Sequence, residues 1–238
     1  MSTYKNGIQT KKQLIEHTYN ALLSNRVSEL KVRDLAKKSG CAPSSVYQHF
    51  SSLNNLVTVA SIKFLDEYTL AYSKMLNEST DIIESYLNGW ELFCKFAFKK
   101  PDVFYHLFWG LDALDLEEAI MQYYSVFPLN PPKIYSIQYY LTFLTGDVVE
   151  RDFMLMRTMA SQGLVTVEDA RYVSIVVTSI ARNFLAGCRN TSETEREKAR
   201  AQCMELVRYT LNMALNSCRY QNKAQQKKAS PENNLGET

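Results

Sequence analysis

The residues with the clearest chemical potential in this sequence lie at positions 43–49. Ser44, Ser45, Gln48 and His49 are small or polar residues that donate or accept hydrogen bonds. On a helix they would share the outer surface, because the apolar residues between them would turn toward the protein interior. A helix with such a surface can hydrogen-bond to base edges in the major groove of DNA, so this segment is a candidate DNA-reading element.

A helix, a glycine turn and a second helix would position those side chains. Val32, Leu35 and Ala36 are spaced i, i+3 and i+4, which predicts a short helix with one apolar face. Gly40 can supply the left-handed residue that ends this helix, and Pro43 suits the first turn of the next. The side chains that we expect to anchor the second helix inward are Val46, Tyr47 and Phe50.

The run VRDLAKKSGCAPSSVYQHFSSLNNL at residues 32–56 resembles the DNA-binding signature of the tetracycline-repressor (TetR) family. The shared features are a V-R-D-[IL]-A start, a glycine turn, a [VL]-Y-x-[HY]-F recognition helix and a leucine a few residues on. The resemblance covers about residues 10–56, and beyond Leu56 only length and helical layout agree. It implies an all-α fold, with a three-helix helix-turn-helix domain followed by a larger helical domain for ligand binding and dimerisation.

The resemblance also implies which side chains would contact DNA. Pro43, Ser44 and Gln48 would face base edges, and the amide of Gln48 can bond to adenine through both of its ends. The residues expected at the phosphate backbone are Lys31, Arg33, Ser45, Tyr47 and His49, although Tyr47 could instead be a core aromatic. The sequence departs from the family at Leu53, where a lysine is usual, and at Ala42, where Ser or Thr often caps the recognition helix.

Further helices are expected on both sides of this segment. Residues 1–9 would form a loose arm before a helix that opens with a capping-box pattern at Thr10 and ends near Asn25. A fourth helix would run from Ser52 to about Leu76 as one rod. Later helices are expected over residues 80–99, 101–109, 116–126 and 133–160. We therefore expect a DNA-binding domain at 1–51 and a ligand-binding and dimerisation domain at 52–218.

Two helices at 166–186 and 193–217 are expected to form an antiparallel hairpin. One apolar stripe contains Val173, Val177, Ile180, Phe184, Ala199, Cys203, Leu206, Thr210 and Met213. A second contains Val176, Ala181, Val207, Leu211, Ala214 and Leu215. Two stripes favour a homodimer interface, as the resemblance implies, although both stripes could be ordinary core. Residues 219–238 are polar and lack periodicity, which predicts a disordered tail.

Aromatic residues concentrate in the second domain. Residues 86–143 contain sixteen of the twenty-eight Phe, Trp and Tyr residues. Most could be core, but a cavity between helices with such walls would suit a hydrophobic or aromatic molecule. The candidate ligand-binding residues are Trp90, Phe93, His106, Phe108, Trp109, Tyr123, Tyr139 and Phe143, with His106 as the polar anchor. In the family that this sequence resembles, such a ligand commonly lowers DNA affinity.

Charge, export signals and cysteine spacing indicate the kind of partner, the location and the absence of a metal site. Residues 1–51 hold eight Lys or Arg against three Asp or Glu, which suits a polyanionic partner, although a solvated basic surface gives the same count. No export signal or membrane span is recognisable, so we expect a cytoplasmic protein. The spacing of five cysteines and three histidines predicts reduced thiols and neither metal nor cofactor.

No phosphate loop, H-E-x-x-H or G-x-S-x-G motif occurs, so an enzyme is not expected. The alternative that remains is a ligand-binding co-regulator of the same fold that has lost or altered DNA binding. Ala42 and Leu53 are the features that favour it.

Overall fold

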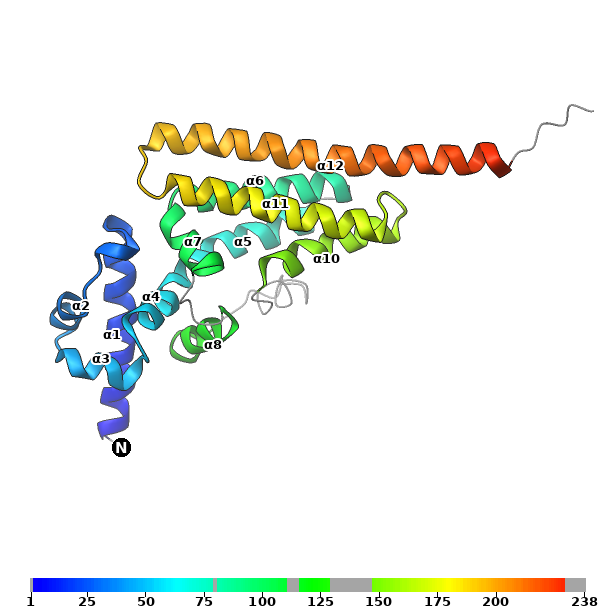
Figure 1. The fold of residues 1–238 in the computed structure, drawn as a ribbon. Helices are drawn as coiled ribbons and strands as arrows, with labels where there is room; N and C mark the ends of the chain where they lie inside the picture. Colours follow the sequence, from blue (N-terminus) through cyan, green and yellow to red (C-terminus); the bar gives the residue numbers. More distant parts are fainter. Residues whose placement is uncertain (1, 79–80, 111–115, 129–146, 230–238) are drawn as a thin grey trace, which may run out of the picture.

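The computed structural model describes residues 2–78, 81–110, 116–128 and 147–229. Helices make up all of the regular structure in these ranges (Figure 1), so the predicted all-α class is confirmed. Their bounds are α1 Ser2–Ser24, η1 Val27–Glu29, α2 Val32–Lys38, α3 Pro43–His49, α4 Leu53–Ser61, α5 Lys63–Glu78, α6 Ile82–Ala97, α7 Pro101–Trp109, α8 Leu116–Val126, α10 Val148–Ser161, α11 Val167–Cys188 and α12 Glu193–Ala229.

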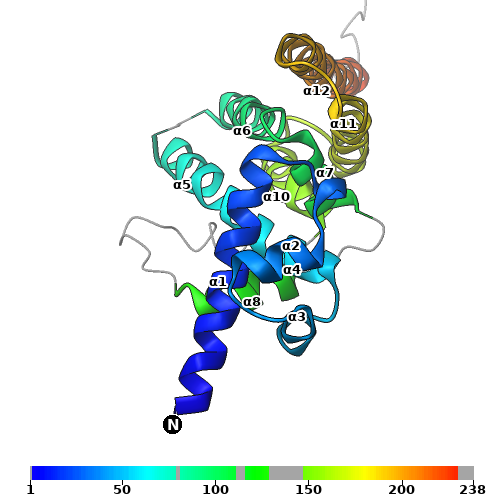
Figure 2. The same cartoon turned by 90° about the vertical axis from the view of Figure 1, so that its left-hand side faces the viewer.

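Helices α1, α2 and α3 form a small N-terminal head. Leu14 and Leu22 of α1 are fully buried, and they belong to the same hydrophobic cluster as Leu35 of α2 and Val46 of α3. Figure 2 shows α3 at the end of the molecule away from α11 and α12. The head therefore presents α3 on the side of the molecule opposite the α11–α12 hairpin (Figure 2).

Helix α1 begins at Ser2, so the loose arm expected at residues 1–9 and a helix start at Thr10 are wrong over residues 2–9. The capping-box pattern at Thr10 lies inside the helix. No proline precedes it, so nothing in the sequence stops the helix from extending toward the N-terminus.

The rod expected from Ser52 to Leu76 is two helices joined at Ile62. Ser52 caps α4 by accepting a 3.0 Å hydrogen bond from the backbone N–H of Asn55. The Ile62 backbone then accepts from Leu65 N at 2.9 Å, a bond spanning three residues instead of four, and its side chain is fully buried. Helix α4 therefore ends and α5 begins at the residue whose side chain is buried in the core. This break depends on tertiary packing, so the periodicity of the sequence could not predict it.

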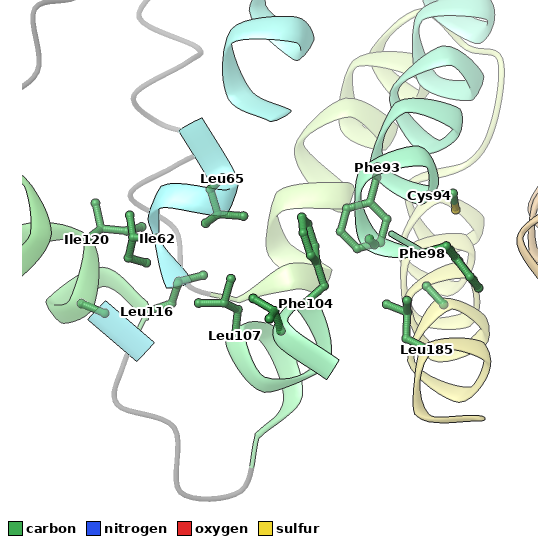
Figure 3. Packing of buried hydrophobic residues seen from close by; sticks show 14 of the residues in the cluster. Ile62, Leu65, Phe93, Cys94, Phe98, Phe104, Leu107, Leu116, Ile120 and Leu185 are labelled. Atoms are coloured by element: carbon green, nitrogen blue, oxygen red, sulfur yellow. The ribbon is translucent and has the colours of Figure 1, made fainter. Parts of the chain in front are cut away.

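The core of the body lies where α4, α5, α6, α7 and α8 meet. Figure 3 shows Ile62 and Leu65 between Ile120 of α8 and Leu107 of α7, all of them members of one hydrophobic cluster. Phe104 of α7 adds an aromatic ring to that cluster. Head and body thus share a continuous apolar core through α4, which packs against α1 of the head and against α7 and α8 of the body.

Helices α11 and α12 form the expected antiparallel hairpin (Figure 1). The predicted capping box at the start of α12 is present, because Ser192 Oγ accepts from the Glu195 backbone at 3.3 Å and Glu195 Oε2 accepts from the Ser192 backbone at 2.8 Å. The helix continues through Arg219 to Ala229, so residues 219–229 are not the disordered tail that we expected. Ala, Gln and Lys there are good helix formers.

The hairpin has an exposed apolar face, which we call the outer face. It comprises Tyr172, Ile175 and Val176 of α11 and Leu206, Tyr209, Met213 and Tyr220 of α12. On α12 the two expected stripes differ in burial. Leu206 and Met213 of the first stripe are exposed, whereas Val207 and Leu211 of the second are buried. Rotation of α12 about its axis, set by packing against α6 and α11, decides which stripe faces the core.

None of the helices in the described ranges has the length and apolar content needed to cross a membrane. The same ranges contain no group of three or more His, Cys, Asp or Glu side chains suited to a metal ion.

Candidate nucleic-acid interface and ligand cavity

A tight turn at Gly40 places α3 on the surface of the head. Gly40 has a φ of +67°, a left-handed conformation that glycine adopts without strain. The Cys41 backbone N–H donates to Ala36 O at 3.0 Å, which closes the end of α2. Pro43 then opens α3, as its fixed φ predicts. The glycine turn expected from the sequence is present.

Helix α3 buries one side and exposes the other. Val46 is fully buried and Phe50 is 2% exposed, so these residues fix the helix on the head. Pro43, Ser44 and Gln48 are exposed, as contact with base edges would require. Tyr47 is 57% exposed, so its expected role as an inward anchor is wrong. Positions 46 and 50 already occupy the inner face, and the residue after Val46 points about 100° away from it.

The expected phosphate contacts differ in exposure. Lys31 and Arg33 near the start of α2 are exposed, whereas Ser45 and His49 are half-buried. Burial lowers the pKa of His49, and the positive charge of Lys11 lowers it further. Lys11 therefore brings a cation from α1 to the end of α3, a residue that the sequence did not single out. The adjacent pair Lys11 and Lys12 on a helix was the available signal.

The two departures from the family pattern have structural consequences. Ala42 occupies the cap position of α3, and its side chain makes no capping hydrogen bond. Leu53 opens α4 and packs, half-buried, against the hydrophobic cluster. Leu53 therefore contributes to packing where the family usually places a charge.

A cavity of about 70 Å³ lies between α5, α6, α7 and α10. It is lined by Tyr68, Tyr72, Tyr86, Gly89, Trp90, Phe93, Phe108, Val148, Arg151, Asp152 and Leu155. Three of the predicted ligand-binding residues, Trp90, Phe93 and Phe108, are in this lining. Phe93 is central to the wall, because its ring centre lies 5.9 Å from those of both Phe104 and Phe108.

The other candidate ligand residues lie elsewhere. His106 and Trp109 line a second hollow between α7, η1 and the end of α11, which also contains Arg26 and Asp102. Tyr123 of α8 packs against Phe127, with ring centres 4.9 Å apart. Tyr139 and Phe143 are outside the described residues. The aromatic residues thus pack at several separate places. Only those on the side of a helix that faces the cavity contribute to its wall.

Asp152 is the first polar group of the cavity that the sequence did not reveal. It accepts hydrogen bonds from Trp90 Nε1 at 2.8 Å and from the hydroxyl of Tyr86 at 3.2 Å. Burial raises the pKa of Asp152 to about 6, although these hydrogen bonds oppose the shift. The aromatic wall is thereby tied to α10 through a carboxyl group that titrates near neutral pH.

Arg151 is the second such group. Its Cζ lies 4.4 Å from the centre of the Phe108 ring, a cation–π contact. Its Nε is shielded from solvent and has no hydrogen-bond partner in the described part of the chain. Burial lowers the pKa of this guanidinium. An aromatic cavity with a buried donor and a buried carboxyl group can bind a small ring that carries polar atoms.

Comparison with known proteins identifies the fold. No protein-family model and no curated protein matches the sequence. Among solved structures, a protein described as a TetR-family transcriptional regulator from Rhodococcus sp. is 13% identical and has a TM-score of 0.51, with 85% of this chain and 98% of that chain covered. This chain has the TetR fold.

Two further solved structures are similar to this chain over most of their length. A transcriptional regulator from Cytophaga hutchinsonii is 13% identical, with a TM-score of 0.52 and coverage of 85% of this chain and 96% of its own. RolR, solved in complex with resorcinol, is 10% identical, with a TM-score of 0.54 and coverage of 89% and 95%. The TetR resemblance inferred from residues 32–56 therefore extends, at the level of fold, to most of the chain.

Proposed function

We propose that this protein is a ligand-responsive, homodimeric transcriptional repressor that binds palindromic DNA. In this proposal, α3 of each subunit enters the major groove, with Pro43, Ser44 and Gln48 at the base edges. Lys31, Arg33, Ser45, Tyr47 and His49 would contact the phosphate backbone. An effector in the cavity would lower DNA affinity.

The exposed surface of α3 is the observation that carries this proposal. Ser44 and Gln48 face solvent on a helix whose opposite side is fixed by buried Val46 and Phe50. This combination, in a TetR fold, gives a rigid platform with adaptable hydrogen-bonding groups, which is what direct base reading needs. A cytoplasmic location and the absence of enzymatic activity remain predictions of the same proposal.

The positions of the cavity helices support an effector mechanism. Phe108 of the cavity and His106 lie on the same short helix α7, and His106 is 2.8 Å from Thr58 of α4. Tyr68 and Tyr72 of the cavity lie on α5, which follows α4 directly. A ligand that displaces either α5 or α7 would therefore move α4 and, with it, the head. Affinity for DNA would fall if that displacement changed the spacing of the two α3 helices.

The outer face of the hairpin supports dimerisation. Its members Tyr172, Ile175 and Val176 are spaced i, i+3 and i+4, and Leu206, Tyr209 and Met213 show similar spacing on α12. Two copies of α11 and α12 could bury these side chains as a four-helix interface. A symmetric dimer would place two α3 helices for half-sites one helical turn of DNA apart, about 34–36 Å, or a multiple of that.

Selection from a random pool of DNA duplexes tests the function and requires no known operator sequence. We expect the full-length protein to enrich a palindrome and to bind it with an affinity that falls steeply with salt, since phosphate contacts release counterions. Failure to enrich any sequence, together with a flat salt response, would contradict DNA binding.

The alternative is a co-regulator of the same fold that has lost or altered DNA binding. The uncapped start of α3 at Ala42 and the apolar Leu53 are the features that favour it. It would bind small aromatic ligands in the cavity but show no preference among DNA duplexes. The same selection experiment separates the two functions.

A further inference from the structure

Arg151 is a half-buried residue whose guanidinium forms no ion pair in the described part of the protein. Asp147, one helical turn away, opposes the lowering of its pKa by burial. The shielded Nε of Arg151 has no hydrogen-bond partner in the described ranges. One side of the guanidinium is covered by the Phe108 ring at 4.4 Å. A shielded donor without a hydrogen-bond partner is unfavourable, so a ligand that brings an acceptor of opposite charge would gain binding energy here.

Asp152 does not fill this role, although it is the neighbouring residue. Its carboxyl group is engaged by the indole N–H of Trp90 at 2.8 Å and by the Tyr86 hydroxyl at 3.2 Å. Both donors belong to the protein, so part of the accepting capacity of Asp152 is used before a ligand arrives. The unsatisfied group of the cavity is the guanidinium.

The walls and the size of the cavity limit the rest of the ligand. Apart from Arg151 and Asp152, the lining consists of tyrosines, other aromatic rings, two aliphatic side chains and Gly89. An added Cβ at Gly89 would lie 3.0 Å from Cε2 of Tyr72, so α5 and α6 are already in close contact at this point. The cavity volume is about 70 Å³, whereas a cavity of about 150 Å³ accepts benzene. A single ring is therefore a group that modest movement of Tyr72 or Phe108 could admit.

We propose that this cavity binds a single-ring aromatic carboxylate, with its carboxylate paired to Arg151 and its ring packed against Phe93 and Phe108. The inference rests on the proposed function only in taking this cavity as the effector site. A planar carboxylate suits a guanidinium, because two oxygens can accept parallel N–H donors. Pairing with Arg151 would also pull on its contact with Phe108 and thus on α7.

Direct binding to the full-length protein, without DNA, tests the ligand class. Isothermal titration with sodium benzoate, benzamide and resorcinol compares one anionic ring with two neutral rings of similar size. We expect benzoate to bind at least about tenfold more tightly than either neutral compound, because the charge-assisted hydrogen bond is made only by the carboxylate. Equal binding of all three, tighter binding of resorcinol, or no binding of benzoate would overturn the proposal.

Two arginines on α10 supply a matched pair of variants. Arg151→Met removes the charge from the cavity and keeps an apolar side chain of similar length. Arg157→Met makes the same change at an exposed position outside the lining. We expect Arg151→Met to weaken benzoate binding by about tenfold or more and to leave resorcinol binding within about threefold, whereas Arg157→Met should change neither. Arg151→Lys should retain part of the affinity for benzoate, since it keeps the charge but loses the planar donor pair.

Thermal unfolding shows whether a variant that loses ligand binding is still folded. Without ligand, Arg151→Met should be at least as stable as the parent protein, because it removes a shielded donor that has no hydrogen-bond partner in the described part of the chain. If benzoate binds with the expected dependence on Arg151 but leaves DNA affinity unchanged, the ligand class stands and the effector mechanism fails. If DNA binding is established and Arg151→Met binds benzoate as well as the parent protein does, the ligand class fails alone.

Discussion

The Nε2 atom of His106 lies 2.8 Å from Oγ1 of Thr58, which joins α7 of the body to α4 beneath the head. The single hydroxyl proton of Thr58 is directed at Asn54 O, 2.8 Å away. Thr58 must therefore accept from His106, which places the imidazole proton on Nε2. Burial lowers the pKa of His106, although Asp102 opposes this shift, which favours the neutral ring. The bond is a buried polar link between the two parts of the protein.

The first prediction is that Thr58→Val weakens the communication between cavity and head. The change leaves the Nε2–H donor of His106, which is 8% exposed, without its partner. We expect a loss of about 1–3 kcal/mol in the free energy of unfolding, measured in urea. The effect of a cavity ligand on DNA affinity should shrink as well. Thr158→Val is the matched control, because the Thr158 hydroxyl bonds within its own helix, to Met154 O; an equal loss in the control would show that the link is not special.

The second prediction separates base reading from backbone contact on α3. Gln48→Ala should lower DNA affinity and also relax the preference at one base pair of each half-site, by about 1–3 kcal/mol of discrimination. Tyr47→Ala should weaken binding by a similar factor on all sequences, since the exposed ring is proposed to contact phosphate. Competition between matched and single-substituted duplexes measures both. An unchanged preference in Gln48→Ala would remove Gln48 from the base-reading set.

The head was accessible to sequence reasoning because its signals are local. Gly40, Pro43 and the spacing of Leu35, Val46 and Phe50 each act within one or two helical turns, and the structure places the turn and the buried side as expected. Helix periods alone also gave α6, α7, α8 and α11 to within a few residues, and the start but not the end of α12. Local patterns define which segments are helical.

The cavity was less accessible because its members meet only through tertiary packing. His106 looked like a polar anchor among aromatics, yet its side of α7 faces Thr58, 48 positions earlier in the chain. Arg151 and Asp152 were not predicted to line the cavity, because two charged residues on an amphipathic helix are usually exposed to solvent. The orientation of α10 in the folded protein turns both toward the cavity. The break at Ile62 has the same origin, since burial of one side chain ends a periodic pattern that otherwise continues.

The third prediction concerns pH. The folded protein raises the pKa of Asp152 from 3.8 to about 6, so between these values the folded state binds more protons than the unfolded state. The contribution of Asp152 to stability is therefore most favourable below about pH 4 and is lost as pH rises through 6. Asp152→Asn cannot titrate. Its free energy of unfolding relative to the parent should rise by about 2 kcal/mol from pH 4 to pH 7, as a pKa change of this size implies over that range. A constant difference across this range would contradict the shift.

The fourth prediction tests the outer face of the hairpin as the dimer interface. Met213 of α12 is 57% exposed and lies one and two turns from Tyr209 and Leu206, so an arginine there would place one charge from each subunit in a desolvated interface. Met121 of α8 is 68% exposed and lies outside the outer face, which makes Met121→Arg the matched control. Analytical ultracentrifugation should show the parent and Met121→Arg as dimers and Met213→Arg as a monomer at micromolar concentration. Binding to a palindromic duplex should then weaken far more than binding to a single half-site, because joining two heads raises the effective concentration of the second. If Met213→Arg remains dimeric, the subunits associate through another surface, and the half-site spacing expected from α11 and α12 no longer follows.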